Sequence, residues 1–147
     1  MLSLTKKTEY ALIALSYLAE HQDKTVSARE VAENYGMPGA LVMNILKTLH
    51  HAKLLSSTRG TKGGYRLIAD LSTISVHDLI GILEGPVRLV ECALDGKTHE
   101  PRQCRIYPAC PIQAPVHGLH AQMVKFLSET KLTDILSPKR RAERAHA

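Results

Sequence analysis

Apolar positions recur at helical spacing near the start of the chain and predict a helix over residues 5–20. One face of this helix carries Leu12, Leu15, Leu18 and Ala19, and a second face carries Tyr10, Ile13 and Tyr17. A helix with two apolar faces is expected to be buried on two sides. One face would pack on its own domain, and the other would take a partner subunit or a long C-terminal helix.

A helix-turn-helix pattern follows this first helix. Ser27 and Glu30 form a capping-box pattern at the start of a helix over residues 28–35, which ends at Gly36. Pro38 begins the next helix, because proline fits a first helical turn. The expected buried stripe of that third helix is Leu41, Val42, Ile45, Leu46 and Leu49. Two short helices around a glycine-containing turn are typical of DNA-binding proteins.

The opposite face of the third helix is a candidate surface for reading DNA. Its candidate residues are Pro38, Ala40, Met43, Asn44, Lys47 and Thr48. In this hypothesis the N-terminal part of the helix meets base edges, with Asn44 pairing with adenine and Lys47 with guanine or phosphate. The alternative is an ordinary solvated helix face.

A β-hairpin is predicted next, with strands over residues 54–58 and 65–68. The glycine-rich turn between them carries Arg59, Lys62 and Gly63, which we expect to meet the DNA backbone or a minor groove. The turn lacks the phosphate-loop pattern and does not open a helix, so no nucleotide site is expected. A hairpin after a helix-turn-helix predicts a DNA-binding wing.

Two further helices complete the pattern. Ser75 caps a helix over residues 76–84, which ends at Gly85-Pro86. A second helix is expected over residues 115–130. Its heptad-spaced apolar residues are Ile112, Val116, Leu119, Met123 and Phe126. This spacing favours pairing between two subunits, and packing within one subunit is the alternative. The basic tail after residue 136 has no apolar periodicity and is expected to be disordered.

Composition narrows the function classes. With 147 residues and 44% hydrophobic content, the chain is long enough for a globular core. Its formal net charge of +5 favours a polyanionic partner such as nucleic acid. The sequence has no nucleophile with a base at recognisable spacing, no paired acids and no cofactor loop, so we do not expect an enzyme. Without a signal peptide or a bilayer-spanning run, we expect a cytoplasmic protein that does not bind membranes.

The three cysteines lie close together in the sequence. Residues 93–103 separate Cys92 from Cys104, and residues 105–109 separate Cys104 from Cys110. Converging thiolates beside cationic residues suit an iron-sulfur cluster. Spacing alone leaves three alternatives: unligated thiols, a zinc site with a histidine, and a pair that forms a disulfide on oxidation.

Several motifs resemble one family. The runs are Thr8-Glu9-Tyr10-Ala11-Leu12, Arg59-Gly60-Thr61-Lys62-Gly63-Gly64-Tyr65-Arg66-Leu67 and Leu83-Glu84-Gly85. Together with the third helix, they resemble the bacterial winged-helix transcription factors that include the iron-sulfur cluster regulator and the nitric-oxide-sensitive repressor. The resemblance implies a homodimer that binds a two-fold symmetric operator, usually as a repressor. In several members, a cluster bound by three cysteines controls DNA affinity.

The cysteine segment departs from the family pattern. Relatives space their cysteines evenly, whereas the first gap here is the longer one, so residues 95–103 must loop out. Gln113 stands where the iron-sulfur cluster regulator carries a histidine ligand. Glu9 aligns with the acidic ligand that the nitric-oxide-sensitive repressor takes from its partner subunit. Glu9 of the partner subunit is therefore the first candidate for a fourth ligand, followed by His99 and His117.

The sequence thus predicts a mainly helical winged helix-turn-helix protein with a two-stranded wing, a cysteine loop and a long dimerisation helix. Residues 1–84 would form the DNA-binding domain, 85–111 the cluster loop, 112–136 the dimerisation region and 137–147 the tail. The hypothesis is a homodimeric transcriptional regulator whose affinity for double-stranded DNA depends on a two-iron or four-iron cluster. The alternative is a cluster-free regulator switched by cysteine oxidation or a small ligand.

Overall fold

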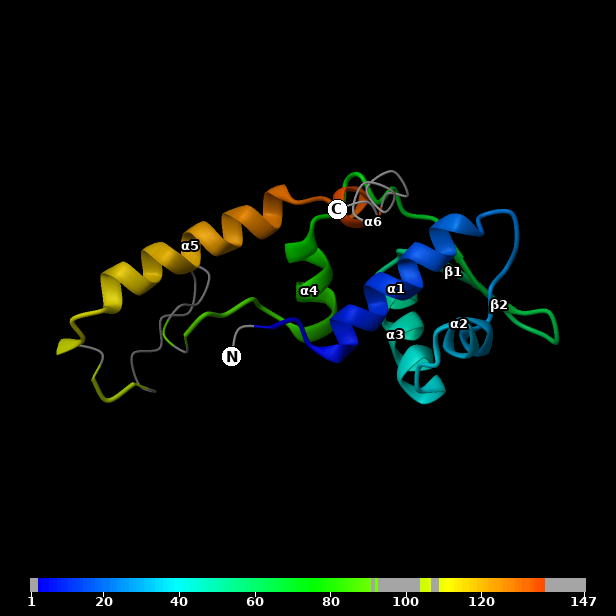
Figure 1. The fold of residues 1–147 in the computed structure, drawn as a ribbon, viewed down its shortest axis with the longest axis horizontal. Coiled ribbons are helices and arrows are strands. Elements are labelled where there is room, and N and C mark those ends of the chain that lie inside the picture. Colours follow the sequence, from blue (N-terminus) through cyan, green and yellow to red (C-terminus); the bar gives the residue numbers. More distant parts are fainter. Residues whose placement is uncertain (1–2, 91, 93–103, 107–108, 137–147) are drawn as a thin grey trace, which may run out of the picture.

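The computed structural model describes residues 3–90, 92, 104–106 and 109–136, and it contains a helical body from which one long helix projects (Figure 1). The predicted loop residue His99 and the tail lie outside the described residues. Six helices and two strands occur in the described part of the chain. They are α1 (Lys6–Glu20), α2 (Ala28–Tyr35), α3 (Gly39–His51), β1 (Leu55–Thr58), β2 (Gly64–Leu67), α4 (Val76–Glu84), α5 (Gln113–Glu129) and α6 (Leu132–Leu136).

The starts of the helices follow the local sequence signals. The hydroxyls of Thr5 and Ser27 accept hydrogen bonds from the first turns of α1 and α2, and Ser75 forms a full capping box with Asp78. The return bond expected from Glu30 to Ser27 is not formed. The Glu30 carboxylate instead accepts from the Tyr17 hydroxyl at 2.8 Å, and it also pairs with Lys24. This link joins α1 to α2 and the turn between them.

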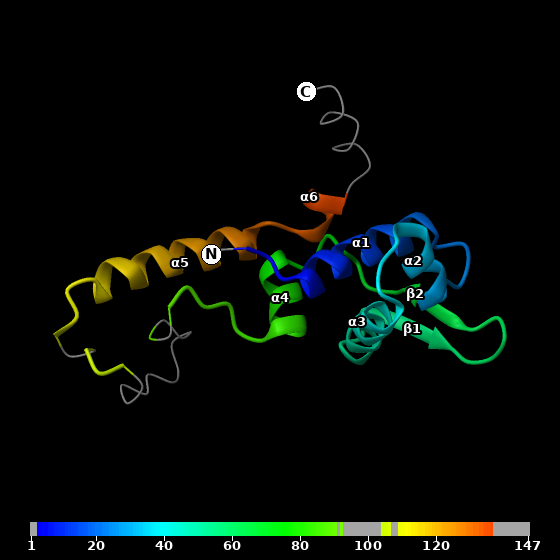
Figure 2. The same cartoon turned by 60° about the horizontal axis from the view of Figure 1, so that its bottom comes forward.

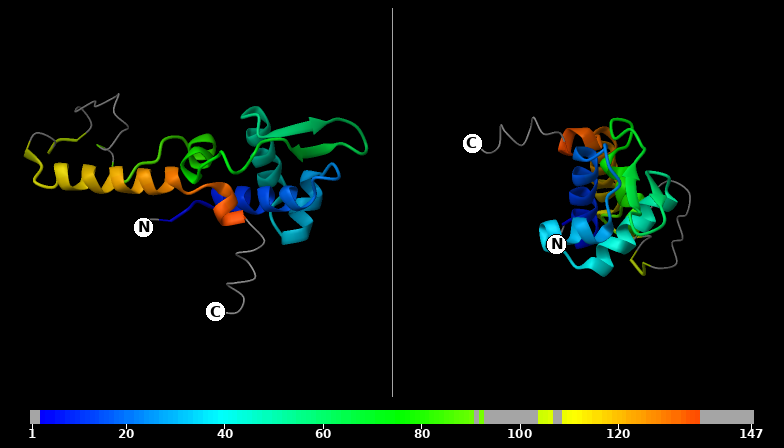
Figure 3. Two further views of the ribbon diagram at one scale, coloured as in Figure 1. Left: turned by 90° about the horizontal axis from the view of Figure 1, so that it is seen from above. Right: turned by 90° about the vertical axis from the view of Figure 1, so that its right-hand side faces the viewer.

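The hydrophobic core lies between α1, α2, α3 and α4 (Figure 3). α1 buries Ala11, Ala14, Leu15 and Leu18, and α3 buries Val42, Ile45, Leu46 and Leu49. The expected second face of α1 is only half-buried at Tyr10 and Ile13, whereas Tyr17 is buried. Residues 6–84 therefore supply most of the core from their own side chains.

The two strands form one antiparallel sheet, in which Leu55 pairs with Leu67 and Thr58 pairs with Gly64. The sheet is attached to the body beside α2, because the backbones of Val26 and Tyr65 exchange hydrogen bonds of 2.9 and 2.7 Å. β1 begins one residue later than predicted, and β2 both begins and ends one residue earlier than predicted. The hairpin tip points away from the body (Figure 2).

The C-terminal end of α5 returns to the core. Backbone bonds from Val76 N to Thr130 O and from Leu132 N to Ile74 O, both 2.9 Å, join this end to the segment before α4. Leu132 of α6 is fully buried in the core cluster. Within the described residues, no helix is long and apolar enough to cross a membrane.

Candidate DNA-binding surface and cysteine segment

The predicted reading face of α3 is exposed to solvent. Pro38, Ala40, Met43, Asn44 and Lys47 are all exposed, while the opposite side of the helix is buried in the core. Thr48 is half-buried, and its hydroxyl donates to the Asn44 carbonyl at 2.9 Å. Its single proton is therefore committed to the helix backbone, so Thr48 can only accept a further hydrogen bond.

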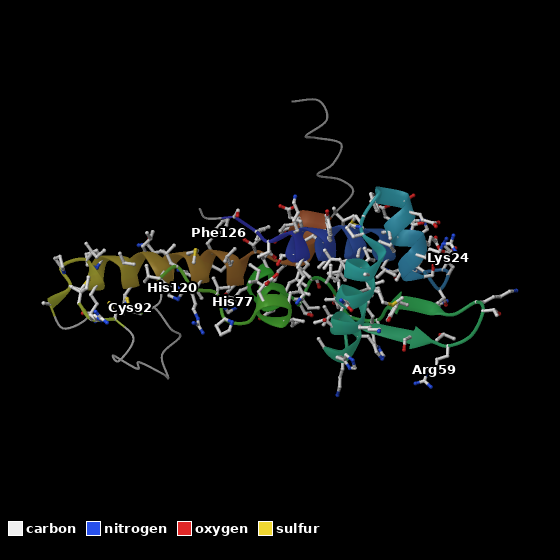
Figure 4. All side chains as sticks on the ribbon, turned by 90° about the horizontal axis from the view of Figure 1, so that it is seen from below. Lys24, Arg59, His77, Cys92, His120 and Phe126 are labelled. Carbon is white, nitrogen blue, oxygen red and sulfur yellow. The ribbon has the colours of Figure 1, made fainter. Side chains whose placement is uncertain are left out.

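The turn between β1 and β2 carries the exposed residues Arg59 and Lys62. Figure 4 shows Arg59 beside the hairpin, at its outer end. Gly63 has a structural requirement of its own, because a Cβ atom there would lie 2.3 Å from the Thr58 carbonyl oxygen. Gly64 is equally constrained: a Cβ atom would lie 2.4 Å from the Val26 carbonyl oxygen. The glycines therefore let the wing turn tightly and pair closely with Val26. A contact between Gly63 and DNA stays a prediction.

Positive charge on this surface is not neutralised by neighbouring carboxylates. In the described part of the chain, Lys47, Arg59 and Lys62 form no ion pair, and the same is true of Lys53 and Arg66 beside them. Among the described residues, the lysines and arginines that do pair are Lys6, Lys24, Arg29 and Lys125. Of these, Arg29 of α2 lines a hollow beside Met43 of the reading face. Lys53, before β1, and Arg66, on β2, are also exposed, and the sequence alone did not predict them as DNA contacts. The face formed by α3 and the wing is thus available to a polyanion.

The cysteines lie at the opposite end of the molecule from the wing. Cys92 lies beside the projecting part of α5, and Cys110 comes just before that helix begins (Figure 4). Cys92, Cys104 and Cys110 are all free thiols and all half-buried. Across residues 3–90, 92, 104–106 and 109–136, no three His, Cys, Asp or Glu side chains are grouped closely enough to hold a metal ion. The thiols are therefore the right donor type, but this structure does not gather them.

The candidate fourth ligands differ in their surroundings. Glu9 lies in the first turn of α1 and pairs with Lys6 at 2.6 Å, with 40% of its side chain exposed. His117 is half-buried on α5. An exposed ion pair of this kind is weak, so the Glu9 carboxylate can change partners at little cost.

The start of α1 is tied to the end of α4, which leads into the cysteine segment. The Lys7 ammonium donates to the Leu83 carbonyl at 2.5 Å, and the Thr5 hydroxyl donates to the Glu84 carboxylate. The Leu83-Glu84-Gly85 motif thus anchors the N-terminus of α1. Residues 85–90 continue from this junction to Cys92.

The predicted dimerisation seam is divided between two sides of α5. Val116 and Met123 are half-buried, whereas Ile112, Leu119 and Phe126 are 59%, 55% and 67% exposed. The buried residue of α5 is His120, which faces its own subunit beside α4, where the half-buried His77 lies (Figure 4). The exposed apolar residues are spaced by seven and form one stripe, which we call the α5 stripe.

Comparisons with known proteins agree with this architecture. The family model "Rrf2: Iron-dependent Transcriptional regulator" matches residues 4–138. Protein aau3 of Rhizobium meliloti (strain 1021) is 32% identical over 111 residues, which cover 76% of this chain and 70% of that protein.

Two solved structures have the same overall fold. CymR (YrzC), the global cysteine regulator of B. subtilis, has a TM-score of 0.68 at 26% identity, covering 93% of this chain and 98% of CymR. IscR of T. potens has a TM-score of 0.68 at 25% identity, covering 99% of this chain and 92% of IscR. Because the family model spans nearly all of the sequence, the chain belongs to the Rrf2 family, whose members are DNA-binding transcriptional regulators and not enzymes.

Proposed function

We propose that this chain binds operator DNA as a homodimer, and that an iron-sulfur cluster held by Cys92, Cys104 and Cys110 controls its affinity. The main observation that supports this proposal is that a basic surface and the cysteine thiols lie at different ends of the molecule. An uncompensated positive face lies on α3 and the wing, and three free thiols lie at the far end of α5. The α5 stripe lies between them.

DNA binding would use α3 in a major groove. Ala40, Met43, Asn44 and Lys47 are the exposed side chains that would reach base edges. Asn44 has the amide that pairs with adenine, and Met43 offers an apolar contact to a thymine methyl group. Arg59 and Lys62 would contact phosphates or the minor groove beside the site.

The homodimer would form through the α5 stripe. Three large apolar side chains on one helix face cost solvation free energy unless another surface covers them. A two-fold axis near Leu119 would place Ile112 of one subunit against Phe126 of the partner subunit. The two reading helices would then face a two-fold symmetric operator.

The same symmetry supports Glu9 of the partner subunit as a fourth ligand. Phe126 and Leu127 share a hollow of about 470 Å³ with Leu4, Thr5 and Thr8 at the start of α1. Antiparallel pairing would bring Ile112, and with it Cys110, to this hollow of the other subunit. Glu9 is the residue after Thr8, and among the described residues its carboxylate pairs with the exposed Lys6.

The residues fit a cluster in chemistry, because three thiols are soft ligands and the family is described as iron-dependent. When bound, the cluster would supply a site that responds to redox state, nitric oxide or iron supply. Residues 85–90 would relay its state, since they join Cys92 to the α4 and α1 junction held by Lys7. The signal would then change how α3 and the wing are presented to DNA.

A cluster-free regulator switched by thiol oxidation is the second candidate. It is favoured by the absence of a gathered ligand set among the described residues, and by the likeness to CymR, the global cysteine regulator of B. subtilis. In this case oxidation would join two of the three thiols.

An absorption spectrum of protein purified without oxygen separates the two candidates, with iron, acid-labile sulfide and zinc measured on the same sample. Broad absorbance at about 400 nm with iron and sulfide, together with a change in DNA affinity on cluster loss, supports the cluster. A colourless protein that resists reconstitution, and whose DNA affinity changes on thiol oxidation, contradicts the cluster and supports the second candidate.

A further inference from the structure

His50 connects the reading helix to the wing through its side chain. It lies in the last turn of α3 and is half-buried. Its Nδ1 atom is 2.9 Å from the Leu55 carbonyl oxygen, and its Nε2 atom is 3.3 Å from the Ser57 hydroxyl. Both partners belong to β1. One imidazole therefore contacts two positions on the same strand.

The chemistry of the partners determines which ring nitrogen carries the proton. A carbonyl oxygen can only accept, so Nδ1 of His50 must donate to Leu55. In the neutral imidazole, Nε2 is then an acceptor, and the Ser57 hydroxyl donates to it. The side chain thus uses both ring nitrogens on the wing.

The ring also contacts the second strand. The centroids of His50 and Tyr65 are 6.3 Å apart, with the ring planes at 65° in an edge-to-face arrangement. Tyr65 of β2 is itself held by two backbone hydrogen bonds to Val26, before α2. His50 is therefore in contact with both strands at the base of the wing.

Backbone hydrogen bonds to α3 fix the path of the chain as far as Leu54, at the start of the wing. Lys53 adopts a left-handed conformation with φ of 64°, and its amide donates to the His50 carbonyl at 2.9 Å. The Leu54 amide donates to the Leu49 carbonyl at 3.0 Å, which ends the helix. Beyond Leu54, the buried Leu55 side chain packs in the core, and the side-chain hydrogen bonds of His50 join β1 to the last turn of α3.

We propose that His50 is a positioning residue for DNA binding, which holds the wing at the angle where Arg59 acts on the same DNA as the reading face of α3. This inference rests on the proposed function of α3 and the wing. Without the His50 side chain, the hairpin keeps its own strand pairing, its bridge to Val26 and the buried Leu55 side chain, but it loses its side-chain hydrogen bonds to α3. Arg59 then contributes less to the affinity for DNA.

A double-mutant cycle of His50→Ala and Arg59→Ala in the full-length chain tests the proposal. The probes are a labelled duplex selected from a random pool by the wild-type protein and a duplex of mixed sequence. Arg59→Ala should weaken binding roughly three- to fivefold in the wild-type background, the effect of one lost phosphate contact. In the His50→Ala background the same change should cost less than about twofold, because the wing is already misplaced.

The dependence of affinity on salt concentration gives a second readout. His50→Ala should lower the slope of log affinity against log salt by about one, although the variant removes no charge from the wing. His50→Asn, which keeps a donor near Leu55, should restore part of the slope. His21→Ala is the matched control, because His21 also bonds a carbonyl through Nδ1 but lies at the end of α1. It should leave the Arg59 effect unchanged.

If His50→Ala is folded and Arg59→Ala weakens DNA binding equally in both backgrounds, His50 does not position the wing. The proposed DNA-binding function would not be affected by that result. If His50→Ala does not fold, Ser57→Ala takes its place, because it removes only the bond to Nε2. Ser57→Ala should reduce the Arg59 effect in the same direction, and an undiminished effect overturns the proposal. A wild-type protein that binds neither duplex overturns both this inference and the proposed function.

Discussion

The body of the molecule and helix α5 are stabilised in opposite ways. The buried apolar side chains lie between Ala11 and Leu83, with Leu132 from α6 added to them. The long helix α5 contributes to the buried set only His120, while it exposes Ile112, Leu119 and Phe126. The body thus covers its apolar surface with its own chain. α5 leaves apolar surface exposed, and we propose that a second subunit covers it, since the hydrophobic effect favours burial of apolar surface.

The helix starts show part of the same contrast. Side chains cap α1, α2 and α4 in the body, whereas α3, after Pro38, has no side-chain cap. α5 follows Ile112 and also has no side-chain cap. The body therefore specifies its elements by local hydrogen bonds and by packing. α5 depends on its length and on what covers it, since short isolated helices are marginal in water. The following substitutions test this contrast.

Removing the buried side chain of Leu132 should have the largest effect on stability. Leu132→Ala leaves a cavity in the core of the body and should lower the free energy of unfolding by about 2–5 kcal/mol. Ile135→Ala, on the same helix but 45% exposed, is the control and should change it by less than about 0.5 kcal/mol. Urea denaturation measures both. Equal effects would mean that α6 does not belong to the core.

A charged residue in the α5 stripe should weaken the association of two subunits without unfolding either of them. Phe126, which is 67% exposed in the single chain, would be desolvated in the proposed homodimer. Phe126→Asp should therefore raise the dissociation constant of the homodimer roughly thirtyfold or more, because it would bury a charge at that contact. Sedimentation over a range of concentrations measures this constant. Ala121→Asp adds the same charge to an exposed position on another side of α5 and should leave it nearly unchanged. An unaltered dimer in Phe126→Asp would remove the role of the stripe.

Closing the space at Gly64 should damage the wing. Gly64→Ala would place a Cβ atom against the Val26 carbonyl, and it should destabilise the protein by about 1–3 kcal/mol and weaken DNA binding. Gly81→Ala in α4 is the control, because no atom lies within 4 Å of a Cβ atom there, and alanine should stabilise that helix slightly. Thermal unfolding and DNA titration measure the pair. A stable, fully binding Gly64→Ala protein would show that the wing is not held against Val26.

Acid should lower the free energy of unfolding, because it breaks the capping box at the start of α4. The Ser75 hydroxyl and amide donate to the Asp78 carboxylate and lower its pKa below the ordinary value of 3.8. Because the folded pKa is below the unfolded one, this stabilisation is complete above pH 3.8 and is lost as the pH falls through the lowered pKa. Asp78→Asn should cost about 0.3–1 kcal/mol at neutral pH and nothing in strong acid. Denaturation at several pH values checks it, and a cost independent of pH would exclude the carboxylate as its source.

Local signals predicted most of the elements within a residue or two. The helix at Val76–Glu84 matches its predicted range, and α1, α2 and α3 begin at the residues after Thr5, Ser27 and Pro38. These boundaries follow from capping groups and helical spacing, which act over a few residues. Helix α6 was not predicted, because five residues give little periodicity. Its burial depends on contact with α1, which is remote in sequence.

The candidate site shows the same division. Periodicity placed Ala40, Met43, Asn44 and Lys47 on one face of a helix, and the wing motif placed Arg59 and Lys62 at a turn. Neither signal could show that Glu30 bonds Tyr17, or that His50 reaches β1. Those partners were not predictable, because each bond joins elements whose relative placement is set by packing.

By itself, the sequence determined the order of the helices, the two-stranded wing, the positive charge of the reading region and the clustering of three cysteines in one segment. These features depend on short-range spacing and residue type. Only the tertiary structure decided that Leu132 completes the core, that the heptad seam divides at Val116 and Met123, and that the wing is held by His50 and Val26. Each of these depends on which distant surfaces meet, and that is decided when the apolar faces of all the elements are buried together.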